Sequence, residues 1–154
     1  MDEWKLPWAG GCRCGRVRLE VTKSPLLTGA CHCTGCQRMT AGPFSMSVAV
    51  PTDGFAVTHG ETVLGGIQDV TQHHHCAFCK SWLYTTAPEM GNFVNLRAST
   101  LDDHTWFAPF VETWTREKLP WVQTPASHSF ATLPELTAWP DLIADYQKHG
   151  PRPH

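Results

Sequence analysis

All seven cysteines of this 154-residue chain fall into three short groups. The groups are Cys12-Arg-Cys14, Cys31-His-Cys33-Thr-Gly-Cys36 and Cys76-Ala-Phe-Cys79. In an extended strand, residues i and i+2 project to the same face, so the two cysteines of the first group can bind one metal ion together. A Cys-x-x-Cys pair wraps a turn and points both sulfurs inward, which is typical of half of a structural zinc site. Thiolate ligands favour zinc or an iron–sulfur cluster among the common biological metals.

The three groups divide most naturally into a set of four thiolates and a set of three. The set of four joins the first group to the last, and consists of Cys12, Cys14, Cys76 and Cys79. It would form a closed tetrahedral site and restrict a loop of about 60 residues in the unfolded chain. The middle group, Cys31, Cys33 and Cys36, would bind a second ion and leave its fourth position open to water or substrate. An open position is the mark of a reactive metal site.

Three other interpretations of the cysteines remain open. They could be inert buried thiols, or one Cys-x-x-Cys pair, Cys33/Cys36 or Cys76/Cys79, could be redox-active. The main rival is a second structural zinc completed by a histidine, either His32 or one of His73, His74 and His75. Alternation along an extended segment points His32 away from the neighbouring thiols, and the three consecutive histidines are interpreted as a polar strand or loop.

Composition narrows the class of protein. Hydrophobic residues make up 42% of the chain and the formal net charge is -2, so a disordered chain and a broad nucleic-acid-binding surface are both disfavoured. No apolar run reaches the roughly 18 residues that a membrane helix requires. Residues 1–8 carry early acidic charge and no apolar core of a secretion signal. We therefore expect a cytoplasmic location, where clustered cysteines are more often metal ligands than disulfides.

Short segments with alternating apolar residues dominate the first two thirds of the chain. They predict strands at Val17–Thr22, Phe44–Val50, Phe55–Thr58, Ser81–Thr85 and Phe93–Arg97. Helical signals are fewer: one turn at Thr34–Met39, and a helix over about 140–148 that begins at Pro140 and ends before Gly150. The sequence predicts a single domain over residues 1–154, mainly β and antiparallel, with a short C-terminal helix.

The cysteine groups are also the signature of a known family. The run Gly10-Gly-Cys-Arg-Cys-Gly-Arg-Val17, together with the other two groups, resembles the glutathione-dependent formaldehyde-activating (GFA, or CENP-V/GFA) domain family. Similarity continues in Val94–Asp102 and Lys118–Trp121, so that it spans about residues 8–130. The resemblance implies a folded-sheet (β-tent) zinc-binding fold with two zinc ions per chain. It assigns the structural zinc to the set of four cysteines and the catalytic zinc to the set of three. Lys80 departs from the family pattern, which often has glycine after the last cysteine, so we expect modest backbone strain there.

The activity that the resemblance implies is that of a carbon–sulfur lyase or synthase, as in S-(hydroxymethyl)glutathione synthase. Its substrates would be a small thiol such as glutathione and an aldehyde such as formaldehyde. An anionic thiol requires a cation near the reactive zinc, for which Arg38 is the nearest candidate, ahead of Lys118 and Arg116. Trp114 and Trp121 flank this charged stretch and are candidates for lining a substrate pocket. No general acid or base is evident, which keeps a second hypothesis open: a zinc-stabilised binding module without catalytic activity.

Overall fold

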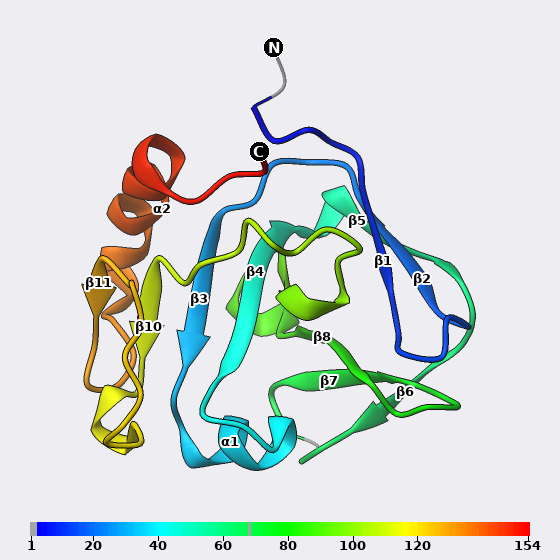
Figure 1. Ribbon diagram of the computed structural model, residues 1–154, viewed down its shortest axis with the longest axis horizontal. Helices are drawn as coiled ribbons and strands as arrows, with labels where there is room; N and C mark the ends of the chain where they lie inside the picture. The colour runs from blue at the N-terminus through cyan, green and yellow to red at the C-terminus, as the bar shows by residue number, and fades with distance from the viewer. Residues whose placement is uncertain (1–2, 68) are drawn as a thin grey trace.

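The computed structural model describes residues 3–67 and 69–154, and two β-sheets form its framework (Figure 1). The smaller sheet has the strand order β1-β2-β5 and is antiparallel throughout. Its strands are β1 (Trp8–Gly11), β2 (Arg18–Val21) and β5 (Phe55–His59). The apolar residues that predicted the second of these strands, Val17, Leu19 and Val21, are all buried.

The larger sheet has the strand order β11-β10-β3-β4-β9-β8-β7-β6. In chain order these strands are β3 (Leu27–Cys31), β4 (Ser45–Pro51), β6 (Thr62–Gly65), β7 (Gln72–Cys76), β8 (Trp82–Thr86), β9 (Phe93–Arg97), β10 (Val111–Thr113) and β11 (His128–Ser129). The three histidines before Cys76 therefore lie in a strand, β7. Strands β1, β3, β6, β10 and β11 have no strong alternation of apolar and polar residues, and the sequence did not predict them.

An entirely antiparallel arrangement is wrong at one edge of the larger sheet. Strand β10 is parallel to both of its neighbours, β3 and β11. Parallel neighbours cannot be joined by a tight turn, because the chain must return to the end from which it started. The long connection between β10 and β11, residues 114–127, makes this return possible. An alternating apolar pattern predicts that a segment is a strand, but it does not predict whether that strand runs parallel or antiparallel to its neighbours.

Both predicted helices are present. Helix α1 (Thr34–Thr40) lies at the ends of β3 and β4, and α2 (Trp139–His149) lies on the outside of the fold, where it contacts β3 (Figure 1). Short 3-10 turns occupy Thr52–Gly54, Pro88–Met90, Ala98–Thr100, Thr115–Glu117 and Leu136–Ala138. Among the described residues, no helix has both the length and the apolar character needed to cross a membrane.

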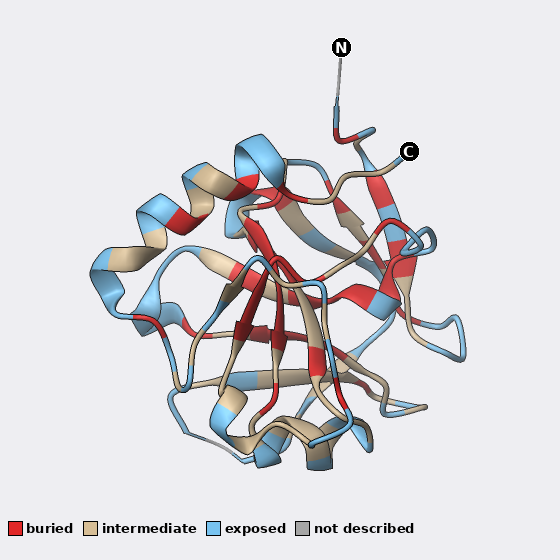
Figure 2. Cartoon of the chain, turned by 60° about the vertical axis from the view of Figure 1, so that its left-hand side comes forward, coloured by how far each residue is buried: buried red, intermediate tan, exposed pale blue. Residues whose placement is uncertain are grey.

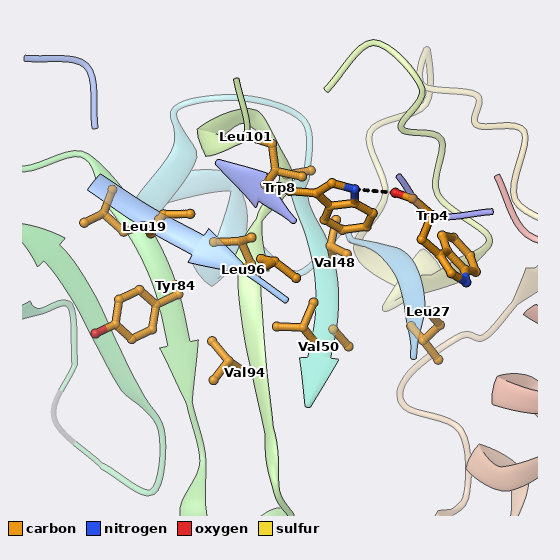
Figure 3. Close-up of a cluster of buried hydrophobic side chains, with 14 of the residues drawn as sticks. Trp4, Trp8, Leu19, Leu27, Val48, Val50, Tyr84, Val94, Leu96 and Leu101 are labelled. Atoms are coloured by element: carbon orange, nitrogen blue, oxygen red, sulfur yellow. Dashed lines mark hydrogen bonds between the residues drawn. The ribbon is translucent and has the colours of Figure 1, made fainter. Parts of the chain in front are cut away.

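The buried apolar side chains form one continuous cluster between the two sheets. Buried residues concentrate in the central strands (Figure 2), and Figure 3 shows Leu19 of the smaller sheet beside Leu96 and Val94 of the larger one. Trp8 packs beside them, and its indole Nε1 donates a hydrogen bond of 2.6 Å to the carbonyl of Trp4. The polar atom of this buried aromatic ring is therefore satisfied.

Tyr146 attaches the C-terminal helix to this core. Its side chain is fully buried, stacks on Trp4 with a centroid separation of 5.7 Å, and meets Phe110 edge to face at 5.4 Å. Its hydroxyl donates to the carbonyl of Pro151. Burial raises the pKa of Tyr146, so the hydroxyl stays protonated and remains a donor.

We expect the substitution Tyr146→Ala to lower the free energy of unfolding by about 3–5 kcal/mol, because it leaves a large cavity in the core. Leu136, whose side chain is 81% exposed in the turn before the same helix, provides the matched control. Leu136→Ala should change the free energy of unfolding by less than about 0.5 kcal/mol. Urea unfolding of both variants measures the difference, and equal effects would show that α2 is not part of the core.

Candidate metal centres

Two turns from different sheets bring the set of four cysteines together. Cys12 and Cys14 follow β1, whereas Cys76 ends β7 and Cys79 lies in the turn after it. The four sulfur atoms all lie within 4.8 Å of one another. Sγ of Cys14 is 3.4 Å from Sγ of Cys12 and 3.8 Å from Sγ of Cys76. The pairing expected from the sequence is therefore the pairing that the fold produces.

The two glycines before Cys12 permit close backbone contacts at the end of β1. A β-carbon at Gly10 would lie 2.4 Å from the carbonyl oxygen of Thr100, and one at Gly11 would lie 2.3 Å from that of Val17. No side chain fits at either distance. An isolated β-bridge between Gly10 and Leu101 joins β1 to the segment that follows β9.

Backbone N–H groups point at the sulfurs of both turns. The N–H of Val17 is directed at Sγ of Cys12, at 3.3 Å, and that of Cys79 at Sγ of Cys76, at 3.4 Å. Such hydrogen bonds favour the thiolate over the thiol. Lys80 completes the second turn with φ 61°, so the expectation of a left-handed backbone at this position is confirmed.

The geometry of these four donors fits a zinc ion. Zinc–sulfur distances of about 2.3 Å in a tetrahedron place neighbouring sulfurs about 3.8 Å apart, close to the separations observed here. Burial raises the pKa of Cys79, but hydrogen bonds from Ser81 outweigh it and lower the pKa to about 5. This lowered pKa favours the thiolate, which is the form that binds a metal.

The set of three cysteines lies where β3 runs into α1. Cys31 is the last residue of β3, Cys33 caps the N-terminus of α1, and Cys36 lies in the first turn of the helix. Sγ of Cys33 accepts a hydrogen bond of 3.3 Å from the N–H of Cys36, and all three sulfurs lie within 4.8 Å of one another. Among the described residues, no other cysteine, histidine, aspartate or glutamate belongs to this group.

The thiols of this set differ in their pKa values. A hydrogen bond from Cys36 lowers the pKa of Cys31 to about 5, and the same interaction raises the pKa of Cys36. A hydrogen bond with the buried Ser45 acts on Cys36 in the opposite direction. Three converging sulfurs, one of them already ionised, form a donor set that fits a zinc ion with one position left for another ligand.

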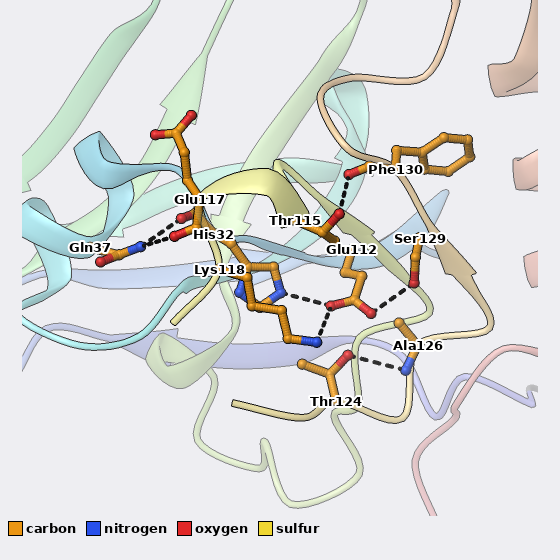
Figure 4. Close-up of polar contacts among 10 residues, drawn as sticks. All are labelled: His32, Gln37, Glu112, Thr115, Glu117, Lys118, Thr124, Ala126, Ser129 and Phe130. Atoms are coloured by element: carbon orange, nitrogen blue, oxygen red, sulfur yellow. Dashed lines mark hydrogen bonds and ion pairs between the residues drawn. The ribbon is translucent and has the colours of Figure 1, made fainter. Parts of the chain in front are cut away.

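His32 points away from the three sulfurs, as alternation predicted. It is fully buried, and its Nε2 lies 2.8 Å from Oε1 of Glu112 in β10 (Figure 4). Ser129 donates to the other oxygen of Glu112 at 2.8 Å, and Nζ of Lys118 lies 3.7 Å from Oε1. Burial raises the pKa of Glu112, but the hydrogen bonds from Ser129 and His32 outweigh it, so that the pKa falls below its ordinary value. Among the described residues, no histidine completes either cysteine set as a further ligand.

A second set of contacts ties α1 to the segment after β10. The side-chain amide of Gln37 donates to the carbonyls of His32, at 2.8 Å, and Glu117, at 3.0 Å (Figure 4). The carboxylate of Glu117 accepts the N–H of Thr34 at 2.9 Å. Residues 112–118 therefore act as a brace that fixes the backbone around the set of three cysteines. Sequence reasoning missed this brace, because Glu112 and His32 are 80 positions apart.

A cavity of about 850 Å³ lies beside Cys12 and the end of α1, and none of Cys31, Cys33 and Cys36 is among its described lining residues. Its lining includes Cys12, Met39 of α1, Met46 of β4, and Phe44, which directly precedes β4. Arg97, at the end of β9, also lines it and is 93% buried. The sequence analysis placed Arg97 in a strand but did not consider it for the site.

The four residues proposed from the sequence for substrate binding lie outside this cavity. Arg38 is exposed on α1, and Trp121 is 73% exposed. Lys118 faces Glu112, and the Trp114 ring lies 4.9 Å from the guanidinium of Arg116. Their part in binding a substrate stays a prediction.

We expect Glu112→Ala to lower the free energy of unfolding by about 3–5 kcal/mol, because it removes one partner of a buried ionic network. Ser129→Ala should cost only about 1 kcal/mol, since it removes one hydrogen bond. Because the pKa of Glu112 is lowered by folding, its contribution is complete above the unfolded pKa and is lost as the pH falls through the folded one. The effect of Glu112→Ala, measured by urea unfolding, should therefore shrink in acid below pH 4.5.

The exposed Glu135 provides the control for loss of a carboxylate. Glu135→Ala should change the free energy of unfolding by no more than about 0.5 kcal/mol at any of these pH values. A pH-independent effect of Glu112→Ala would show that the carboxylate stabilises the fold by packing alone.

Comparison with known proteins agrees with this geometry. No curated protein matches the chain significantly. A crystal structure of a Rhodobacter sphaeroides protein, a Northeast Structural Genomics target, matches with a TM-score of 0.51 at 19% sequence identity. The match covers 61% of this chain and 87% of the other, and at this identity it supports the fold alone.

The family comparison is more specific. The profile described as "Glutathione-dependent formaldehyde-activating enzyme" matches residues 7–117, which contain both cysteine sets. The mainly β fold with two sheets, a terminal helix and these two thiol clusters is the fold that the family resemblance implied. The chain therefore belongs to the glutathione-dependent formaldehyde-activating (GFA) family.

Proposed function

We propose that this protein is a zinc enzyme that forms or cleaves the carbon–sulfur bond of thiol–aldehyde adducts. The set of three cysteines would hold the catalytic ion, and the set of four would hold a structural ion. The observation that carries the proposal is the incomplete donor set: Cys31, Cys33 and Cys36 converge, and no fourth ligand joins them among the described residues. In contrast, Cys12, Cys14, Cys76 and Cys79 supply all four ligands of a closed site.

Zinc bound to three thiolates would offer its remaining position to a substrate thiol and promote loss of the thiol proton. The thiol sulfur then adds to the carbonyl carbon of the aldehyde, and the carbonyl oxygen takes up a proton to give the hemithioacetal. The reverse reaction breaks the same carbon–sulfur bond and returns thiol and aldehyde. Glutathione and formaldehyde, named by the family, are the first pair to test.

The chain's own residues have defined parts in this proposal. The capping geometry of Cys33 and the brace of residues 112–118 hold the three sulfurs in place before a substrate arrives. The hydroxyl of Ser45 holds Cys36 from the neighbouring strand. The cavity of about 850 Å³ beside α1 has room for a peptide-sized thiol.

A binding module without catalysis is the second candidate. It is favoured by one observation: among the described residues, Asp102 is the only carboxylate that lines the cavity, and its side chain is already paired with Arg18. No free carboxylic acid or histidine among the described lining residues is placed to transfer protons. A thiol that ionises on the metal needs no carboxylic acid or histidine for its own deprotonation. The enzyme hypothesis is therefore the better supported of the two.

The two candidates predict different results for Cys36→Ser. For an enzyme, this variant should lower kcat/KM for glutathione and formaldehyde at least about 100-fold, because it removes a ligand of the catalytic ion, and it should still fold. For a module stabilised by two structural ions, it should mainly lower the free energy of unfolding. Turnover, circular dichroism and urea unfolding of the same preparation separate the two readings.

Metal analysis tests the two sites independently of turnover. We expect two zinc ions per chain in the unaltered protein and about one in Cys36→Ser, with the remaining ion held by the set of four. The matched variant Cys79→Ser should instead lose substantial stability, because it opens the closed site that joins the two sheets. A stoichiometry of one, with Cys31, Cys33 and Cys36 free to react with iodoacetamide, would refute the catalytic site.

A further inference from the structure

Arg97 is a buried cation that lacks a carboxylate partner. Only 7% of its surface is exposed, and no ion pair joins it to an acidic side chain among the described residues. Its guanidinium has five N–H donors, of which one makes a hydrogen bond, from Nη2 to the carbonyl of Asn95 at 3.3 Å. The buried Nε has no hydrogen-bond partner. A polar group that is both buried and unsatisfied is costly, so its presence requires an explanation.

Trp82 holds this guanidinium in place. The central carbon of the Arg97 guanidinium lies 4.2 Å from the centroid of the Trp82 ring. This contact fixes the plane of the guanidinium and leaves its N–H edges free of the ring. Burial lowers the pKa of Arg97 to about 10, so the group remains charged at neutral pH. The positive charge is therefore permanent and rigidly placed.

The cavity of about 850 Å³ has an excess of positive charge, although the chain as a whole carries a formal charge of -2. In the part of the chain that the structure describes, Arg13, Arg18, Lys80 and Arg97 line it, against a single carboxylate, Asp102. Arg18 is already paired with Asp102. Arg13 and Lys80 are exposed and directly follow cysteines of the closed set, whose thiolates supply negative charge. Arg97 is left as the buried cation of this cavity without a carboxylate partner among the described residues.

The register of the larger sheet places Arg97 on the same face as the set of three cysteines. Cys31 is paired with Ser45 in β4, and Ser47, two residues further along β4, is paired with Arg97 in β9. Paired residues and residues two apart project to the same face. Strand spacing of about 4.8 Å puts the backbone of β9 about 10 Å from β3. The charges of Cys36 and Cys31 act on Arg97 across this face.

We propose that Arg97 is the anion anchor of this cavity and binds a carboxylate of the substrate thiol, with Trp82 as its platform. The free N–H groups of a guanidinium match the two oxygens of a carboxylate. A ligand that spans the distance between β9 and β3 presents its carboxylate to Arg97 and its sulfur to the set of three cysteines. Arg97 thus selects thiols that carry a carboxylate and excludes neutral thiols. The sulfur end of this assignment rests on the proposed function, whereas the carboxylate end does not.

The test measures binding without reaction. The probe is 3-(methylthio)propanoate, whose sulfur is blocked, compared with its uncharged isostere 3-(methylthio)propanamide. Both are titrated by calorimetry into the zinc-loaded protein. We expect the unaltered protein to bind the carboxylate more tightly than the amide, and Arg97→Met to weaken carboxylate binding at least about 10-fold with no change for the amide.

Two further variants keep the test decisive. Arg97→Lys retains the charge but loses the paired geometry, so it should recover part of the preference for the carboxylate. Arg16→Met removes one positive charge outside the cavity, where Arg16 lies over the exposed ring of Phe78, and should leave the preference unchanged. Zinc content and circular dichroism of every variant confirm that the metal and the fold are retained.

The outcomes separate this proposal from the proposed function. A preference for the carboxylate that survives Arg97→Met overturns the anchor, as does an equal loss of both ligands. Loss of zinc in Arg97→Met with an unchanged preference also overturns it, and would show that Arg97 neutralises the thiolates instead. A preference that depends on Arg97 supports the anchor even if no thiol–aldehyde pair is turned over, in which case only the proposed reaction is refuted.

Discussion

The convergence of seven sulfur atoms at two points is the constraint on which the rest of this structure depends. Four of them require the turn after β1 to meet the turn after β7, although these turns belong to different sheets and are more than sixty residues apart. Beside the first of these turns, Gly10 and Gly11 allow close backbone contacts with Thr100 and Val17, and an isolated bridge joins Gly10 to Leu101. The relation of the two sheets is therefore set largely where the sulfurs meet, and the apolar core fills the space between them.

The segment that carries the set of three cysteines has side chains in two different environments. Along residues 31–33, the two cysteines face the open donor set, while His32 faces the opposite way into a buried network with Glu112. Glu112 lies in β10, the strand that runs parallel to its neighbours. The unusual direction of β10 therefore has a consequence for the site, because it places a carboxylate behind the cysteine-bearing segment and fixes the backbone there.

The charges of the three-cysteine set and of the cavity are opposite in sign. Three thiolates around a divalent ion carry a formal charge of -1, which makes the ion a softer and weaker Lewis acid than one held by neutral imidazoles. Such a centre favours a sulfur ligand over activation of water. The cavity beside it is rich in cations. Its buried arginine, Arg97, packs against the ring of Trp82 and is not paired with a carboxylate. In the function that we propose, a zinc ion on the three cysteines and the cavity would bind different ends of an anionic thiol.

The sequence by itself determined the grouping of the cysteines into four and three, the strands β2, β4, β5, β8 and β9, and both helices, because these features depend on local spacing and period. It could not determine β10, whose direction depends on long connections, nor the pairing of His32 with Glu112 across 80 positions. Arg97 shows the difference most clearly. Its strand was predicted, but the sequence alone does not distinguish a buried arginine in a strand from one that is exposed to solvent. Only tertiary structure decides that its guanidinium is buried beside a cavity, because burial depends on residues from every part of the chain.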